Sequence, residues 1–492
     1  MDRHDGDPME SKQMIVIIAV VVVVIAAVGA YFAFSGGEDE PGEVDDGRDS
    51  LTITEYPSRL LVLGNTNCDD YLNTSDISYL EGVIEDADGG VVDYQTNYMC
   101  DANYDGVVDS ADVDYLTAMV NENWGDGDGD VRYVHYVNVD LEVASYDMTT
   151  EKWVITIISP PLDDMLILNP DLVIGFDNRI TTNQRSPYEA IYDIDSMYDV
   201  GLAATPDVET IVAAADSKNG DVTVFIGSKM YYGGTLETDL ADYPGIQIVR
   251  LPTWEVGDSI EGLLTIGFLL GESENAYAYL EWYEGVCELV QDTVATVPES
   301  ERPAVAVFYP HRGSTGGELL GPMSGEVQNL ALLGIVDVGT EYFDDIGMST
   351  QSDRVDMTYE VLATLIDDYD LDVLIGAVGA PFQVNEDSAG QMQGTIAGMQ
   401  YYYEFWEDRI SDLLPSLDDY CVTGFTFLSG ISECVGQLLM GYYLYPDYFS
   451  EEMVIEVVNE LCDIMGIGDV WNFDSMNLIY DPGDPREILN GA

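Results

Sequence analysis

The sequence predicts an α/β protein in which two lobes of strands and helices are joined by one long helix. One observation is the stretch from Ser273 to Val297, where apolar residues recur at steps of three and four along one helical face. Another is a unit used twice, at 206–228 and 357–379: an amphipathic helix with a Glu at its start, an Asp-rich turn, and a strand ending in Gly. A chain of 492 residues also has room for several domains. Two lobes joined in this way predict a ligand cleft between them.

The joining helix has clear boundaries. Gly271 ends the segment before it, Ser273 is the expected N-cap, and Pro298 stops it. At 1.5 Å per residue it would be roughly 35 Å long, which suits a rigid strut between domains. The apolar face is expected to comprise Tyr277, Leu280, Tyr283, Cys287, Val290, Val294 and Val297.

Charge excludes several function classes. The chain has 16 basic and 92 acidic residues, a formal net charge of −76, which argues against nucleic acid and anionic membrane surfaces as partners and favours cations. Six Cys in 492 residues do not make a disulfide scaffold. The glycine-rich 313–317 lacks the Lys of a phosphate loop, and the three His offer no nucleophile–His–acid set. We therefore expect a binding protein and not an enzyme.

The N-terminal segment predicts a membrane anchor. Met14–Phe34 carries no charge and is long enough to cross a bilayer. Arg3 and Lys12 precede it, and no basic residue follows until Arg48, which places the N-terminus in the cytoplasm and the rest outside. A cleaved signal peptide is the alternative. The acidic run that follows it is expected to be a disordered spacer.

Two related stretches, 64–84 and 101–120, predict calcium loops. Each has oxygen-bearing side chains at loop positions 1, 3, 5, 9 and 12 and a backbone carbonyl at position 7, followed by an apolar-faced helix. The predicted ligands are Asn65, Asn67, Asp69, Tyr71, Asn73 and Asp76 in the first loop, and Asp101, Asn103, Asp105, Val107, Asp109 and Asp112 in the second. The alternative is an acidic, turn-rich surface without metal, which the duplication disfavours.

Because these loops close with Asp and lack the usual entering helix, they resemble a dockerin module, and that resemblance implies a cohesin-like partner. The first repeat departs from the pattern, with Asn65 in place of Asp and Asp70 in place of Gly, so we expect weaker calcium binding there. Cys68 and Cys100 lie near the two loops and would be able to pair outside the cell.

The order of the later segments resembles that of substrate-binding proteins of ABC importers for iron–siderophore complexes and vitamin B12. The similarity covers about 153–466 and rests on SPPLDD, PDVETIV, GIQIVRL, GFLLGESENA, GPMSGEVQNLALLGI and MTYEVLATL in that order. It implies a ligand held between the lobes and an ABC permease and ATPase as partners. It also implies that Glu209 and Glu360 dock onto the permease; a carboxylate facing a helix dipole is the alternative for each.

The resemblance implies a metal chelate of the iron–siderophore type as ligand, with cobalamin or another corrinoid, or haem, as alternatives. Arginine presents a planar donor fork to such anions, and aromatic rings stack on flat ligands. The predicted ligand-binding residues are Arg179, Arg185, Trp254, Tyr309, His311, Arg312 and Arg354. The aromatic run 401–406 fits either the ligand or core packing. A rival hypothesis is a cell-surface interaction protein that acts through the dockerin-like module.

The predicted domain order follows from these segments. It is a cytoplasmic stub (1–13), transmembrane anchor (14–34), acidic linker (35–59), dockerin-like calcium module (60–121), linker (122–132), lobe one (133–272), linking helix (273–298), lobe two (299–470) and C-terminal tail (471–492).

Overall fold

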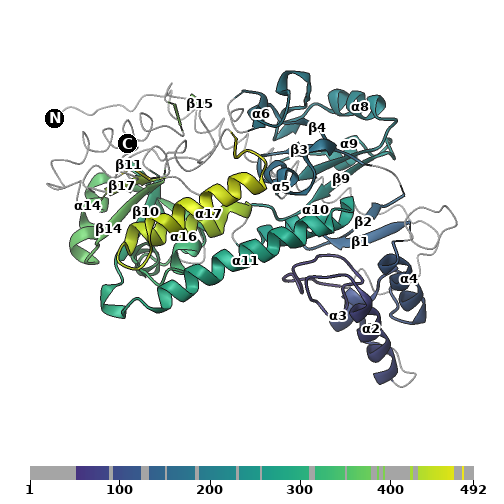
Figure 1. The fold of residues 1–492 in the computed structure, drawn as a ribbon, viewed down its shortest axis with the longest axis horizontal. Helices are drawn as coiled ribbons and strands as arrows, with labels where there is room; N and C mark the ends of the chain where they lie inside the picture. The colour runs from purple at the N-terminus through teal and green to yellow at the C-terminus, as the bar shows by residue number, and fades with distance from the viewer. Residues whose placement is uncertain are drawn as a thin grey trace, which may run out of the picture. The chain divides into compact units, whose positions relative to one another are not determined.

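The computed structural model describes residues 51–87, 92–122, 132–149, 152–182, 188–228, 232–254, 257–309, 316–348, 352–377, 385–386, 392–393, 421–424, 430–469 and 479–480. From Thr52 onward the chain forms one compact unit (Figure 1). Within the described residues, no helix combines the length and the apolar character needed to cross a bilayer. The predicted anchor at 14–34 lies outside those residues.

Lobe one is built on a 5-stranded parallel sheet in the order β5–β4–β3–β8–β9. β8 is buried along its whole length, as expected of a parallel strand covered on both faces. The strands are β3 Trp153–Ile157, β4 Val173–Phe176, β5 Tyr198–Asp199, β8 Val222–Ile226 and β9 Ile246–Arg250, with the pair β6 Gly201–Leu202 and β7 Thr205–Pro206 beside them. The helices are α5 Pro160–Leu168, α6 Asn178–Thr182, α8 Val208–Ser217, α9 Leu236–Asp239 and α10 Ser259–Leu270.

Lobe two has a 7-stranded mixed sheet in the order β13–β11–β10–β14–β17–β18, with β12 also paired to β10. Its strands are β10 Ala304–Tyr309, β11 Gly316–Leu320, β12 Val336–Asp337, β13 Arg354–Thr358, β14 Val373–Ala377, β17 Cys421–Gly424 and β18 Ile479–Tyr480, and a separate pair is β15 Asn385–Glu386 with β16 Met392–Gln393. The helices are α12 Gly325–Ala331, α13 Val338–Asp345, α14 Tyr359–Asp368, α16 Glu433–Leu444 and α17 Glu451–Ile464.

The glycine-rich run 313–317 ends in the strand β11. In the structure Gly316–Leu320 turns back as a strand antiparallel to β10. Gly317 makes this close approach possible: a Cβ there would lie 2.9 Å from the Tyr309 carbonyl oxygen.

The linking helix is α11, Ser273–Ala295, preceded by Gly271 in the left-handed conformation at φ 76°. The N-cap prediction is wrong by one residue, since Glu272 is the N-cap and Ser273 is already helical. The buried residues are Ala276, Tyr279, Leu280, Tyr283, Val286, Val290 and Val294. This stripe differs from the predicted one because α11 packs against α10 and α16, and contacts α5 as well.

The segment 60–121, predicted to be a calcium module, contains α2 Thr74–Asp86, α3 Tyr94–Asn97 and α4 Ser110–Val120, with α2 packed against α4. The expectation that no helix enters the loops is wrong for the second loop, which follows α3 and the 3₁₀ turn Tyr98–Cys100. Both Cys68 and Cys100 are free thiols, so they do not form a disulfide in this structure.

The module shares its core with lobe one. Buried Leu60, Leu61 and Leu63 belong to the same apolar cluster as residues of α10 and α11. Val62 forms a bridge with Tyr136 in β1 Tyr133–Val137, which pairs with β2 Val143–Asp147. The segment leading into the first loop therefore extends the β1–β2 hairpin.

Candidate functional site

The two predicted calcium loops fold alike. The last residue of the first loop, Asp76, accepts hydrogen bonds from the amides of Asn67 at 3.4 Å and Asn73 at 2.8 Å. In the second loop, Asp112 accepts hydrogen bonds from the equivalent amides, those of Asn103 at 3.3 Å and Asp109 at 2.8 Å. The fourth residue of each loop also has a positive φ, 57° at Cys68 and 53° at Tyr104.

The second loop gathers buried negative charge. Asp101 and Asp112 are both 0% exposed. Burial raises the pKa of Asp101 to about 6, and the charge of Asp105 adds to the effect. Burial likewise raises the pKa of Asp112 to about 7, with Asp101 and Asp105 contributing. Carboxylates that repel one another inside a loop of this spacing are suited to a hard cation such as calcium.

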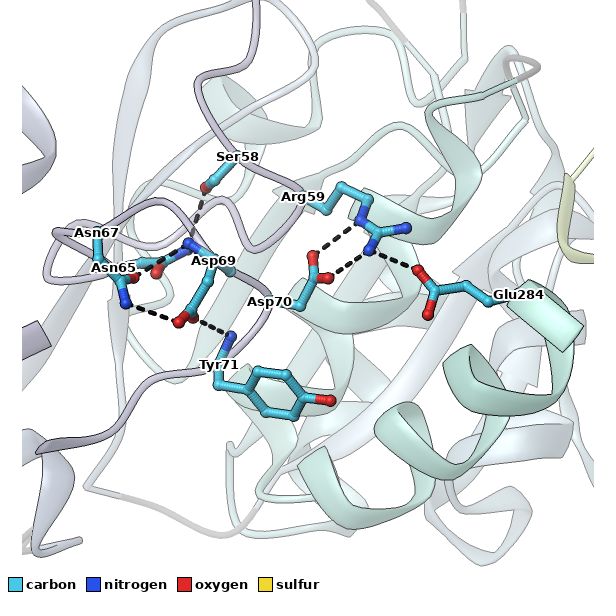
Figure 2. A network of polar contacts seen from close by, with 8 residues as sticks. All are labelled: Ser58, Arg59, Asn65, Asn67, Asp69, Asp70, Tyr71 and Glu284. Atoms are coloured by element: carbon cyan, nitrogen blue, oxygen red, sulfur yellow. Dashed lines mark hydrogen bonds and ion pairs between the residues drawn. The ribbon is translucent and has the colours of Figure 1, made fainter. Parts of the chain in front are cut away.

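The first loop has an acceptor without a partner. The Asn65 amide nitrogen donates to Ser58 Oγ at 3.1 Å (Figure 2). It also donates to the Leu60 carbonyl at 3.1 Å and to the Asp69 carbonyl at 2.6 Å. Its Oδ1 is buried and has no hydrogen-bond partner. An unpaired oxygen at position 1 fits a calcium ligand, because a cation would satisfy it.

These loops would hold calcium with amide and carbonyl oxygens as well as carboxylates. In the part of the chain that the structure describes, no three or more His, Cys, Asp or Glu side chains are grouped so as to hold a metal ion. The first loop has two predicted ligands of those residue types, Asp69 and Asp76, and the second loop has four, Asp101, Asp105, Asp109 and Asp112.

The carboxyl edge of the lobe-one sheet carries a second group. Arg179 in α6 follows β4 and pairs with buried Asp177, with Nε 3.0 Å from Oδ1. Its guanidinium lies 5.3 Å from the ring centroid of Tyr232, which follows β8. Tyr232 stacks on Trp254, which follows β9, at 6.2 Å and 22°. Trp254 is 42% exposed, so this edge presents an aromatic surface.

Lobe two places two more predicted residues near its first strand. The Tyr309 hydroxyl, at the end of β10, donates to the Glu326 carboxylate. Arg354, at the start of β13, forms ion pairs with Asp353 and with Glu318, the latter at 3.7 Å. The charges of Arg354 and Arg179 are therefore matched by neighbouring carboxylates. Arg185, His311, Arg312 and the run 401–406 lie outside the described residues.

The two predicted docking glutamates occupy equivalent places. Glu209 is the second residue of α8 and Glu360 the second residue of α14, and both are exposed. The pKa of Glu360 lies below its usual value because the carboxylate accepts hydrogen bonds from its own amide and from Thr358. Each glutamate therefore presents a charge to solvent at the N-terminus of a helix.

Sequence reasoning missed Asp177 and Tyr232. Asp177 holds this edge of the sheet in place, since its Oδ2 also accepts a hydrogen bond from the Ile158 amide at 2.7 Å. Both residues follow a buried strand, and ligands of open α/β sheets gather at such strand ends, so their position was a usable signal.

A comparison with solved structures identifies the fold. A TroA-like periplasmic binding protein, FepB from Veillonella parvula, aligns with a TM-score of 0.51 at 13% identity, covering 67% of this chain and 95% of that one. This chain has the TroA-like periplasmic-binding fold.

Two further structures align with lower TM-scores. The molybdate-binding protein MolA of Haemophilus influenzae gives a TM-score of 0.48 at 10% identity, over 67% of this chain and 97% of that one. A periplasmic heme binding protein from Pseudomonas aeruginosa gives a TM-score of 0.43 at 16% identity, over 61% of this chain and 94% of that one. No protein-family model and no curated protein matches the sequence.

Proposed function

We propose that this protein is the solute-binding component of an ABC importer, working outside the cytoplasmic membrane. Its ligand in this proposal is a metal chelate of the iron–siderophore type, held between the lobes and delivered to a permease and its ATPase. The fold, with its two α/β lobes joined by α11, supports the proposal. The N-terminal segment 14–34 would anchor the chain to the membrane, and the two loops of the module would bind calcium.

The observation that carries the ligand site is the exposed aromatic pair at the carboxyl edge of lobe one. Trp254 and Tyr232 come from loops after neighbouring strands of the parallel sheet. Stacked rings with one exposed face suit a flat or aromatic ligand. Arg179 lies against the same pair and would contact an acidic group on the ligand.

A binding experiment tests this site. Isothermal titration with a ferric hydroxamate, a ferric catecholate, haem and cobalamin should reveal one ligand that binds tightly to the full chain. Trp254→Ala should weaken its binding by about 2- to 12-fold, since an aromatic contact contributes roughly 0.5–1.5 kcal/mol. The matched control is Tyr243→Ala, because Tyr243 is 43% exposed and lies before β9, at the other end of that strand. Equal losses in both variants, or binding of none of the probes, would reject the site.

Haem or a corrinoid is the second candidate. The stacked pair favours it, because a planar macrocycle offers a wide face to an exposed indole. Arg179 is already paired with Asp177, which weakens its pull on an anionic chelate. Tight binding of haem or cobalamin with no binding of ferric siderophores would replace the first ligand class with this one.

Permease docking is tested separately. Glu209→Arg and Glu360→Arg should impair uptake in cells and leave ligand affinity unchanged, because both carboxylates are exposed at helix starts. Glu341→Arg is the matched control, since Glu341 is an exposed carboxylate in the first turn of α13. If the two docking variants lose ligand affinity instead, these glutamates belong to the ligand site and not to a permease contact.

A further inference from the structure

The first calcium loop is tied to the linking helix by charge. Arg59, just before the loop, donates from Nε to Asp70 Oδ1 at 2.8 Å and pairs with the other Asp70 oxygen as well (Figure 2). The same guanidinium donates from Nη2 to Glu284 Oε1 on α11 at 2.8 Å. Asp70 stands where the second loop has a glycine, Gly106, at φ 88°. The departure from the repeat therefore supplies the carboxylate that anchors Arg59 between loop and helix.

An aromatic contact joins the same two elements. The rings of Tyr71 and Tyr277 lie 4.4 Å apart between centroids. The Tyr71 amide donates to Asp69 Oδ1 at 2.8 Å, so this residue belongs to the loop's own hydrogen-bond pattern. A pocket of about 430 Å³ beside the contact is lined by both rings and by Leu280, Glu281 and Glu284 among others. Thus Tyr71 offers its carbonyl to the predicted calcium site and its ring to α11.

The second loop contacts a different element. The Tyr104 ring lies 5.2 Å from His135 in β1, and the Tyr115 hydroxyl after that loop donates to the Tyr133 carbonyl. The two loops share one fold but have different neighbours. They therefore form a natural pair for comparison, with the second loop as an internal control.

We infer that the docking partner of the first loop is this chain's own linking helix, and that calcium binding in that loop is coupled to the contact with α11. Calcium would fix Asp69 and the Tyr71 carbonyl, and with them the flanking Asp70 and the Tyr71 ring that α11 holds. Thermodynamic linkage then requires both directions: the helix contact tightens calcium binding, and calcium strengthens the helix contact. The inference rests on the proposed calcium binding.

Because α11 joins the two lobes, the concentration of calcium outside the cell would act on the helix that connects them. A dockerin-like surface that already contacts a helix of its own chain is not free to recruit a cohesin there. The structure thus assigns loop one an internal role and leaves loop two as an independent calcium site.

The experiment measures calcium affinity from the α11 side of the contact. In the full chain carrying Asp112→Ala, which removes a second-loop ligand, titration with CaCl₂ reports the first loop alone. Adding Glu284→Gln should weaken this affinity about two- to fivefold, the range expected from a partly exposed ion pair. Adding Tyr277→Ala as well should weaken it further. Glu288→Gln, an exposed carboxylate farther along α11, is the matched control and should change nothing.

The second-loop affinity gives the other half of the test. In the full chain carrying Asp69→Ala, Glu284→Gln should leave calcium affinity unchanged. Unaltered first-loop affinity in both α11 variants would overturn the coupling while leaving calcium binding in place. Absence of any calcium binding by the unsubstituted chain would instead reject the proposed calcium sites. As a second readout, calcium should slow amide hydrogen exchange in 277–284 of the unsubstituted chain, and unchanged exchange would also overturn the inference.

Discussion

Replacing Asp112 by Asn should destabilise the protein only when calcium is present. Asp112 is 0% exposed, and its two oxygens accept hydrogen bonds from backbone amides at 3.3 Å and 2.8 Å. Asn keeps the shape and one acceptor but places an NH₂ group against a backbone donor, which costs about 1–3 kcal/mol. It also removes a buried charge that repels Asp101 and Asp105. Without calcium these two effects oppose each other, so we expect little net change in the free energy of unfolding.

With calcium present, Asp112→Asn should clearly lower the free energy of unfolding. A site stabilises the fold by RT ln(1 + [Ca²⁺]/Kd), which is about 2.7 kcal/mol at a free concentration 100 times Kd. Urea unfolding of the full chain with calcium and with a chelator gives this increment as a difference. Asp112→Asn should lose the second loop's share, and Asp114→Asn, exposed on the same helix, should keep it. An undiminished calcium increment in Asp112→Asn would refute the assignment of this loop.

Two further predictions concern the packing around α10. Burial raises the pKa of Glu261 to about 8, with Asp258 and Glu433 adding repulsion and Arg59 opposing it. Since the folded pKa is raised, the stabilisation is complete below the ordinary value of 4.5 and is lost as the pH rises through about 8. Glu261→Gln should therefore flatten the fall in unfolding free energy measured by urea between about pH 5 and 9, and an unchanged slope would contradict this. Separately, a Cβ at Gly267 would lie 2.8 Å from the Ala276 Cβ, so Gly267→Val should lower the unfolding free energy by about 1–3 kcal/mol. Gly285→Val, where a Cβ meets nothing within 4 Å, is the control, and equal losses in both would show that α10 and α11 are not tightly packed there.

Local patterns predicted much of the architecture. The repeated unit appears as α8 followed by β8 and as α14 followed by β14. Its helix period, Asp-rich turn and buried strand are all contained in consecutive residues, so tertiary contacts were not needed to find them. The long helix was visible for the same reason. Its buried face was misjudged at Tyr277, which is only partly buried and contacts Tyr71 of the first predicted calcium loop.

The remaining features depend on contacts between distant residues. Nothing near Arg59 in the sequence indicates that it would bridge Asp70 and Glu284. The stacking of Tyr232 on Trp254 joins two loops whose proximity follows only from the pairing of β8 with β9. Glu318, an acidic partner of Arg354, lies on β11, which pairs with the strand that carries Arg354. The last two contacts depend on the strand order, and the first depends on how the loop packs against α11. Composition and periodicity determine neither.

The segment Leu60–Leu63 belongs to two domains at once. It leads into the first loop, forms a bridge to β1 and contributes side chains to the apolar cluster of lobe one. The Leu61 amide also donates to Thr265 Oγ1 on α10 at 3.1 Å. A recombination event that moved the repeats to another protein would have to cut through this segment, leaving an open apolar face on the donor lobe and an unfilled core in the module. Evolutionary exchange of the module as a separate cassette is therefore hindered at its junction with lobe one, and the pair is expected to be inherited together.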